Sequence, residues 1–204
     1  AGELAPLAIT GGGLHGIEYT SPVASAQIKS SLLLAGLFAQ GQTRYKEPRL
    51  SRDHTERMFQ FFGIPLAKED DGALVLHGRP SVGWRGVHVT IPGDFSAAAF
   101  FIVGATIVRG SDITIYNVGM NPTRTGLLEI MKKMGADIQV LGLREAAGEP
   151  VADLRVKSSA LKGVTIGQDL IPHTIDEFPV LCVAAAVAEG DTVISGAEEL
   201  RVKE

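Results

Sequence analysis

Three segments of the chain are apolar over the length of a helix, and each is followed by a glycine and a short run of strand-forming residues. The apolar segments are Ser25–Gln40, Asp94–Arg109 and Ile175–Glu189, and the glycines are Gly41, Gly110 and Gly190. A glycine just past the last turn is the usual left-handed stop of a helix, and the β-branched and aromatic residues that follow suit strands. The pattern predicts one supersecondary unit that recurs along the chain.

A second, more polar helix belongs to the same unit. It is predicted at Asp53–Phe62 and again at Thr123–Met134, and hairpin signals follow at Asp71-Gly72 and Gly148-Glu149-Pro150. The unit therefore reads β-α-β-α-β-β over roughly 70 residues, longer than ordinary solenoid repeats. The third copy stops after its first helix and strand, so either the last unit is degenerate or the chain was cut.

The expected fold class is α/β, with repeated βαβαββ units. Helices that are apolar nearly all round are buried on every side, so we expect buried helices with outer sheets. A break near Ile91-Pro92-Gly93 would separate the first unit from the next two.

Composition narrows the class of protein. The chain has 204 residues, of which 45% are apolar and 21% charged, as in globular domains. Its net charge of −4 argues against bulk nucleic-acid binding, and its uncharged runs are too short to span a membrane. The lone Cys182 excludes an intrachain disulfide, fits a reducing compartment and is expected to be buried. The histidines show no metal-ligand spacing, so no metal is expected.

The glycines of Gly11–Gly16 match the spacing of a dinucleotide-binding loop. That loop needs a helix directly after it and an acidic residue about 20 positions later. Here Ile17–Thr20 reads as a strand, so the segment is interpreted as a glycine-rich turn between strands.

Polar residues open the first apolar helix. Ser25 is a common cap residue, but Ser25 and Gln27 with the free N–H groups of a helix start could also bind a phosphate or carboxylate. Both interpretations stay open. Lys29, one turn later, is expected to cover apolar surface with its stem.

The first polar helix opens with Ser51–Met58. Asp53 and Glu56 have the spacing of an acidic capping box. Arg52 lies just before the cap, where its guanidinium either binds a phosphate or is a solvated surface charge.

The third apolar helix opens with Thr174 and Glu177 in capping-box spacing. Asp176 is not needed for that box. It either complements the helix dipole or acts as an ionised general base. At the end of the chain, Lys203 and Glu204 read as an exposed pair at a helix start.

Taken together, these segments resemble the 5-enolpyruvylshikimate-3-phosphate synthases (3-phosphoshikimate 1-carboxyvinyltransferases), in the bacterial form often associated with herbicide tolerance. The resemblance covers the whole chain, in the family's order. The matching stretches are Ala24–Ser30, Ser51–Met58, Pro92–Ala98, Asn121–Gly126, Ile175–Pro179 and Glu198–Glu204.

The resemblance implies a two-domain fold of βαβαββ units, with this chain as the middle fragment. Residues 1–91 would be the last unit of the shikimate 3-phosphate-binding domain, and residues 92–204 would be part of the second domain. The family transfers the carboxyvinyl group of phosphoenolpyruvate to the 5-hydroxyl of shikimate 3-phosphate and releases phosphate. The resemblance also implies that the full-length enzyme is cytoplasmic and monomeric. It implies no cofactor and no metal, and no binding to nucleic acid or to a membrane.

Site residues follow from the same resemblance. Shikimate 3-phosphate would be held by Ser25, Ala26 and Arg52, and Gln27 would touch both substrates. Asp176 would bind substrate and take the 5-hydroxyl proton. Lys203 would bind substrate and, with Glu204, serve the proton transfers and the phosphoenolpyruvate side.

Several family segments that bind phosphoenolpyruvate have no counterpart in the 204 residues, so we expect the chain to be inactive alone. A rival enzyme is the fold relative that acts on UDP-N-acetylglucosamine, although the Ser25–Gln27 and Arg52 segments favour shikimate 3-phosphate. A rival of another class is a non-catalytic module that binds small anions or a partner protein.

Overall fold

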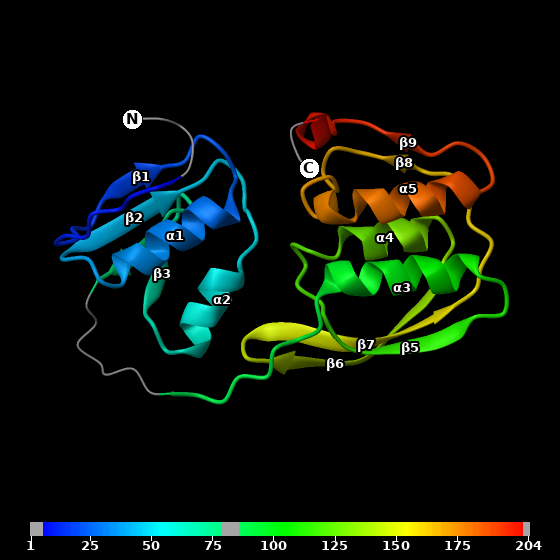
Figure 1. The fold of residues 1–204 in the computed structure, drawn as a ribbon, viewed down its shortest axis with the longest axis horizontal. Coiled ribbons are helices and arrows are strands. Elements are labelled where there is room, and N and C mark those ends of the chain that lie inside the picture. Colours follow the sequence, from blue (N-terminus) through cyan, green and yellow to red (C-terminus); the bar gives the residue numbers. More distant parts are fainter. Residues whose placement is uncertain (1–5, 79–85, 202–204) are drawn as a thin grey trace. The chain divides into compact units, whose positions relative to one another are not determined.

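The computed structural model describes residues 6–78 and 86–201 and shows a mixed α/β chain (Figure 1). The chain divides into two compact units, Ala1–Gly86 and Val87–Glu204, and each is described here by itself. The assignment of residues 1–91 and 92–204 to two domains of a larger protein stays a prediction.

The first unit has the order β-α-β-α-β-β. Its sheet runs β1-β2-β4-β3, with β1 parallel to β2 and the remaining neighbours antiparallel. Helices α1 and α2 connect the strands (Figure 1). The elements are β1 (Glu18–Thr20), α1 (Ala26–Gly36), β2 (Gln42–Lys46), α2 (His54–Phe61), β3 (Leu66–Lys68) and β4 (Leu74–His77).

The core of the first unit lies between its sheet and its helices. Alternate residues of β2 are buried, so Tyr45 points inward and packs with Leu33 of α1, Phe59 of α2 and Leu76 of β4. All four side chains are almost fully buried, and each such burial stabilises the fold by roughly 1.5–3 kcal/mol.

The second unit begins with α3 and ends in a short 3₁₀ helix. Its larger sheet runs β5-β7-β6 and its smaller one pairs β8 with β9. The elements are α3 (Phe95–Ile107), β5 (Asp112–Gly119), α4 (Gly126–Lys133), β6 (Asp137–Ala146), β7 (Glu149–Lys157), β8 (Thr165–Ile166), η1 (Ile175–Glu177), α5 (Phe178–Val187), β9 (Val193–Ile194) and η2 (Glu198–Arg201).

The repeat predicted from the sequence is confirmed by this topology. The order β5-β7-β6 reproduces β2-β4-β3, and a parallel bridge from Gly93 to Val118 stands where β1 pairs with β2. The pair β8–β9 is parallel, like β1–β2. The three glycines after the apolar helices share one left-handed conformation, with φ of +89° at Gly41, +82° at Gly110 and +83° at Gly190.

Helices of the second unit lie between its two sheets (Figure 1). Helix α3 packs on β5, β7 and α5. The core includes Ile102 of α3, Leu127 and Met131 of α4, Leu154 of β7 and Leu181 of α5, which are fully buried. Helices inside and strands outside are what the apolar segments predicted.

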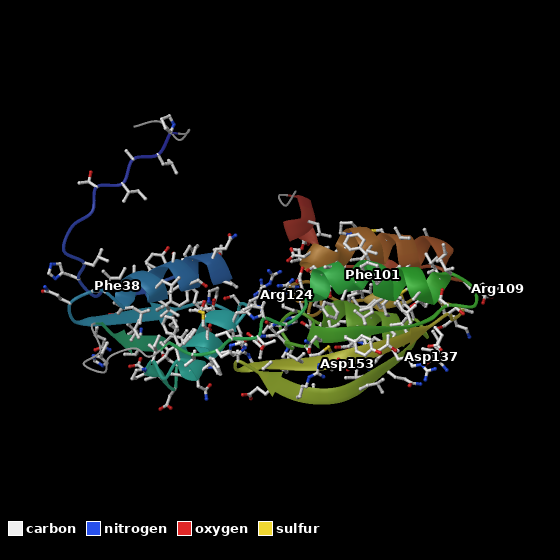
Figure 2. All side chains as sticks on the ribbon, turned by 60° about the horizontal axis from the view of Figure 1, so that its bottom comes forward. Phe38, Phe101, Arg109, Arg124, Asp137 and Asp153 are labelled. Atoms are coloured by element: carbon white, nitrogen blue, oxygen red, sulfur yellow. The ribbon has the colours of Figure 1, made fainter. Side chains whose placement is uncertain are left out.

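Burial of the apolar helices on every side was wrong in one respect. On α3, Phe100 and Phe101 are 61% and 63% exposed, and on α5 Val183 is also exposed. Figure 2 labels Phe101 on α3. Cys182, expected to be buried, is exposed on the same helix. Each of these two helices buries the face that packs against the sheets and helices of its own unit, and within the described part of that unit no element covers the other face.

The glycine-rich segment near the start is not a nucleotide loop. Strand β1 follows it rather than a helix, as predicted, although no strand precedes it among the described residues. Gly16 is required for a different reason: a Cβ there would lie 2.1 Å from the carbonyl oxygen of Gln42. The glycine lets two neighbouring backbones approach closely.

An ion-pair network joins β2 to the turn between β3 and β4. Arg44 pairs with Glu69 at 2.8 Å and with Asp71 at 2.7 Å, and Lys46 pairs with Asp71 at 2.9 Å. Hydrogen bonds from Lys46, from the backbone N–H of Ala73 and from Arg44 hold the pKa of Asp71 well below its usual range. The same carboxylates raise the pKa of Arg44.

We expect Lys46→Met to raise the pKa of Asp71, because the first of those three donors is lost. The pKa of Asp71 is depressed in the folded state, so its contribution to stability is complete at neutral pH and disappears as pH falls through that lowered pKa. NMR titration of the Asp71 carboxyl carbon measures the shift, and Lys68→Met is the control. An unchanged titration curve in Lys46→Met would contradict the assignment.

Candidate functional site

The N-terminus of α1 carries three predicted substrate-binding residues. Ser25 is its cap, and its Oγ accepts a hydrogen bond from the N–H of Ile28 at 3.4 Å, so the capping interpretation is confirmed. The N–H groups of Ala26 and Gln27 have no acceptor within the helix, as in any first turn. Ser25 and Ala26 are half-buried and Gln27 is exposed. This end of the helix can therefore accept an anion.

The sequence suggested that Lys29 lies on the surface, and the structure shows that it does not. Its side chain is fully buried, with Nζ 3.1 Å from Glu47 and 2.6 Å from Glu56. A buried ammonium needs close opposite charges to offset its lost hydration. The two glutamates supply them, one directly after β2 and one from α2.

Ser51 is bound by the same charged cluster through all of its polar groups. Its N–H and its hydroxyl donate to the two oxygens of Glu47, at 3.0 and 2.6 Å. Its carbonyl oxygen accepts a bond from Lys29 at 3.4 Å. Ser51 directly precedes Arg52, which is half-buried. The first turns of α1 and the segment that carries Arg52 are thus joined.

The acidic capping box expected at α2 is wrong. Asp53 is the cap residue of α2 but makes no side-chain cap bond, and its carboxylate instead pairs with Arg57 at 2.9 Å. Glu56 pairs with Lys29. The buried ammonium is a stronger partner than a backbone N–H, so it determines where this carboxylate lies.

A cavity of about 640 Å³ lies within the first unit. Its lining includes Tyr45, Glu47, Asp53 and Glu56, and one buried oxygen of Glu56, Oε2, has no hydrogen-bond partner. Burial raises the pKa of the Tyr45 phenol, which stays neutral. The charged residues of the lining are three carboxylates and one lysine, Lys68. This excess of negative charge disfavours a phosphate, so this cavity is not where we place the anion.

Asp176 belongs to the second unit. It lies in η1, the single 3₁₀ turn before α5, and is half-buried. The capping box predicted around it is wrong, since Thr174 makes no side-chain cap bond and its buried hydroxyl has no partner. Glu177 accepts a bond from the Ser96 hydroxyl of α3 instead.

The turn before α4 packs against the segment that leads to Asp176. Gly126 is required there, because a Cβ would lie 2.1 Å from Oγ1 of Thr174. The N–H of Gly126 donates to the carbonyl of His173 at 3.0 Å. The Asn121 carboxamide shapes the turn by accepting from the N–H and hydroxyl of Thr123, at 2.9 and 2.7 Å. The motif Asn121–Gly126 thus positions the entrance to η1.

Arg124 adds a cation that sequence reasoning did not single out. Its side chain is labelled in Figure 2. Its Nη2 donates to Ser96 at 2.6 Å and pairs with Asp94 at 3.3 Å, and its buried Nε has no partner. Since Ser96 also bonds Glu177, Arg124 is linked to the residue that follows Asp176.

The structure thus joins Ser25, Ala26 and Gln27 to the segment of Arg52 within the first unit, and places Asp176 in the second. Lys203 and Glu204 lie outside the described residues. Sequence reasoning missed the cluster of Lys29, Glu47 and Glu56. The sequence signal that could have pointed to this cluster was Lys29, a lone lysine among the apolar residues of α1.

Two absences hold for residues 6–78 and 86–201. No group of three or more possible metal ligands occurs there. In the same part of the chain, every helix is too short or too polar to cross a bilayer.

Comparison with known proteins gives consistent results. The 3-phosphoshikimate 1-carboxyvinyltransferase of Geobacter sulfurreducens is 59% identical over 203 residues, which are 100% of this chain and 47% of the relative. The protein of the same name from Alkalilimnicola ehrlichii is also 59% identical, over 204 residues, 100% of this chain and 45% of the relative. The chain spans about half the length of the curated relatives it matches.

Solved structures show the same fold. The EPSP synthase of Acinetobacter baumannii matches with a TM-score of 0.86 and 51% identity, over 94% of this chain and 43% of that one. The enolpyruvyl transferase NikO of Streptomyces tendae matches with a TM-score of 0.62 and 22% identity, over 80% of this chain and 37% of that one, which speaks for the fold alone. Because the family's sequence profile matches all of residues 1–204, the chain belongs to the EPSP synthase (3-phosphoshikimate 1-carboxyvinyltransferase) family.

Proposed function

We propose that the whole protein transfers the carboxyvinyl group of phosphoenolpyruvate to the 5-hydroxyl of shikimate 3-phosphate and releases phosphate. Family membership supports the reaction class. One observation supports shikimate 3-phosphate as the substrate. It is the link between α1 and the segment of Arg52, made by Lys29 and Glu47 through Ser51. It brings an anion-accepting helix terminus and a guanidinium into one part of the first unit.

In this proposal the first unit binds shikimate 3-phosphate. Ser25 and Ala26 offer the helix terminus, and Arg52 offers a guanidinium that can hold two phosphate oxygens at once. Gln27 is exposed beside them and can reach both substrates. Residues 1–91 would complete the domain that binds this substrate, and 92–204 would be part of the second domain.

The second unit would supply the base. Asp176 is half-buried at the start of a helix, where the positive end of the dipole keeps a carboxylate ionised and able to take the 5-hydroxyl proton. Lys203 and Glu204 would serve the remaining proton transfers and the phosphoenolpyruvate side. Two carboxylates with opposite duties, Asp176 and Glu204, need environments that separate their pKa values.

We further propose a cytoplasmic protein, monomeric when complete, that needs no cofactor for this reaction. The exposed thiol of Cys182 suits a reducing compartment.

Removal of the Arg52 guanidinium should weaken binding of shikimate 3-phosphate at least tenfold, because a hydrogen bond to a charged group is worth about 1.5–3 kcal/mol. Calorimetric titration of the chain and of Arg52→Ala measures this. Arg49→Ala is the matched control, since Arg49 is exposed in the same loop. Equal affinities of Arg52→Ala and the unmodified chain would refute the role of Arg52, and tighter binding of UDP-N-acetylglucosamine would favour the nucleotide-sugar rival.

A further inference from the structure

We propose that Lys29 and Glu47 are positioning residues, which fix the backbone of Ser51 and so hold Arg52 in place for the phosphate of shikimate 3-phosphate. The proposal rests on the proposed function. It adds a role for two residues that touch neither substrate.

The contacts of Ser51 are the first part of the case. A loop serine usually leaves some of its polar groups to solvent, but here the N–H, the hydroxyl and the carbonyl are all bound by one charged pair. Hydrogen bonds to ionised groups are shorter and stronger than neutral ones. Glu47 therefore holds the N–H and the hydroxyl of Ser51, at 3.0 and 2.6 Å, and Lys29 adds a longer contact of 3.4 Å to its carbonyl. The Cα of Arg52 is only about 3.8 Å along the chain.

The direction of the Lys29 side chain is the second part. Long side chains on a helix point back toward its N-terminus. Lys29 is one turn after Ser25, and the bond from its ammonium to the Ser51 carbonyl ties the loop to the first turns of α1. A second link joins the two segments, a 2.6 Å hydrogen bond between the hydroxyls of Ser30 and Thr55.

The charge of the cluster decides between positioning and direct binding. Lys29 is fully buried and carries one positive charge, while Glu47 and Glu56 carry two negative charges. A phosphate brought to this ammonium would meet two carboxylates at contact distance. The cluster cannot be the anion site itself and acts through the residue that it holds.

Glu47 is not needed merely to neutralise the buried Lys29. Glu56 alone, at 2.6 Å, gives Lys29 a partner. Glu47 is shared between Lys29 and Ser51, and this sharing couples the helix to the loop. Glu47 also accepts a long hydrogen bond, at 3.5 Å, from the hydroxyl of the buried Tyr45.

The test is a double-mutant cycle read by calorimetry with shikimate 3-phosphate. We expect Glu47→Ala to weaken binding about tenfold and the conservative Glu47→Gln about threefold. In the Arg52→Ala background, Glu47→Ala should have almost no further effect, because it acts only through Arg52. Glu129→Ala is the control, since Glu129 pairs with Lys133 on the surface of α4. Thermal melts confirm that each variant is folded.

Shikimate without its phosphate separates positioning from general damage. Its affinity should not change in Glu47→Ala, since Arg52 has no phosphate to hold. Equal losses for both ligands, or equal losses with and without Arg52, would overturn the proposal. If the unmodified chain binds neither ligand, the proposed binding of shikimate 3-phosphate by the first unit fails instead. Hydrogen exchange at the Ser51 amide then tests the positioning alone. The exchange should accelerate in Glu47→Ala but not in Glu129→Ala. Unchanged exchange in Glu47→Ala would refute the proposal that Glu47 fixes the loop.

Discussion

Lys29→Met should lower the free energy of unfolding of the first unit by about 3 kcal/mol, the lower end of the range for breaking a buried ion pair. Methionine fills most of the volume of lysine, so the loss is electrostatic. Two carboxylates, with side chains only 10% and 18% exposed, would face each other without a cation. Denaturant unfolding followed by circular dichroism measures the change.

The matched control for this substitution is Lys133→Met. That lysine also pairs with a glutamate, Glu129 at 2.7 Å, but both side chains are more than half exposed, so its loss should cost less than about 1 kcal/mol. Replacing Glu47 and Glu56 by glutamine together with Lys29→Met should recover part of the stability. A stability of Lys29→Met within 1 kcal/mol of the unmodified protein would show that the cluster is not needed for folding.

Asp176→Asn should reduce kcat by about 10²- to 10⁴-fold, the usual contribution of a general base. The assay needs a complete protein, which a hybrid provides: this chain replaces the matching segment of the Geobacter sulfurreducens relative, to which it is 59% identical. Asparagine keeps the shape and a hydrogen-bond acceptor but cannot take a proton. The KM for shikimate 3-phosphate should change much less than kcat.

Asp169→Asn is the control in the same hybrid, because Asp169 is exposed a short distance before η1. Phosphate release from both substrates is the measurement. A kcat of Asp176→Asn within twofold of the parent hybrid would remove Asp176 from the role of base. An inactive parent hybrid would contradict the proposed function itself.

The fold was predictable because its signals are local and repeated. Each apolar segment, its glycine and the strand that follows lie within a short stretch of chain, and Gly41, Gly110 and Gly190 indeed share one left-handed conformation. Helix ends shifted by a few residues, since α1 ends at Gly36 and not at Gln40. The last turns before such a stop fray easily, and propensity does not fix them.

The polar contacts were not predictable, since their partners are far away in sequence. Glu177 had capping-box spacing, but it bonds Ser96, which is 81 positions away in the chain. Lys29 had the pattern of a surface lysine, but Glu47, 18 positions later, draws it inward. Local spacing describes what a side chain could do, and tertiary packing offers stronger partners.

The exposed side of α5 gives this protein a chemical handle. Cys182 is the single cysteine of the sequence, it is free and exposed, and it lies on the uncovered apolar side of the helix beside Val183. A thiol-reactive fluorophore would therefore attach at one defined position. Its emission would report directly on the polarity of that helix face and on anything that later covers it.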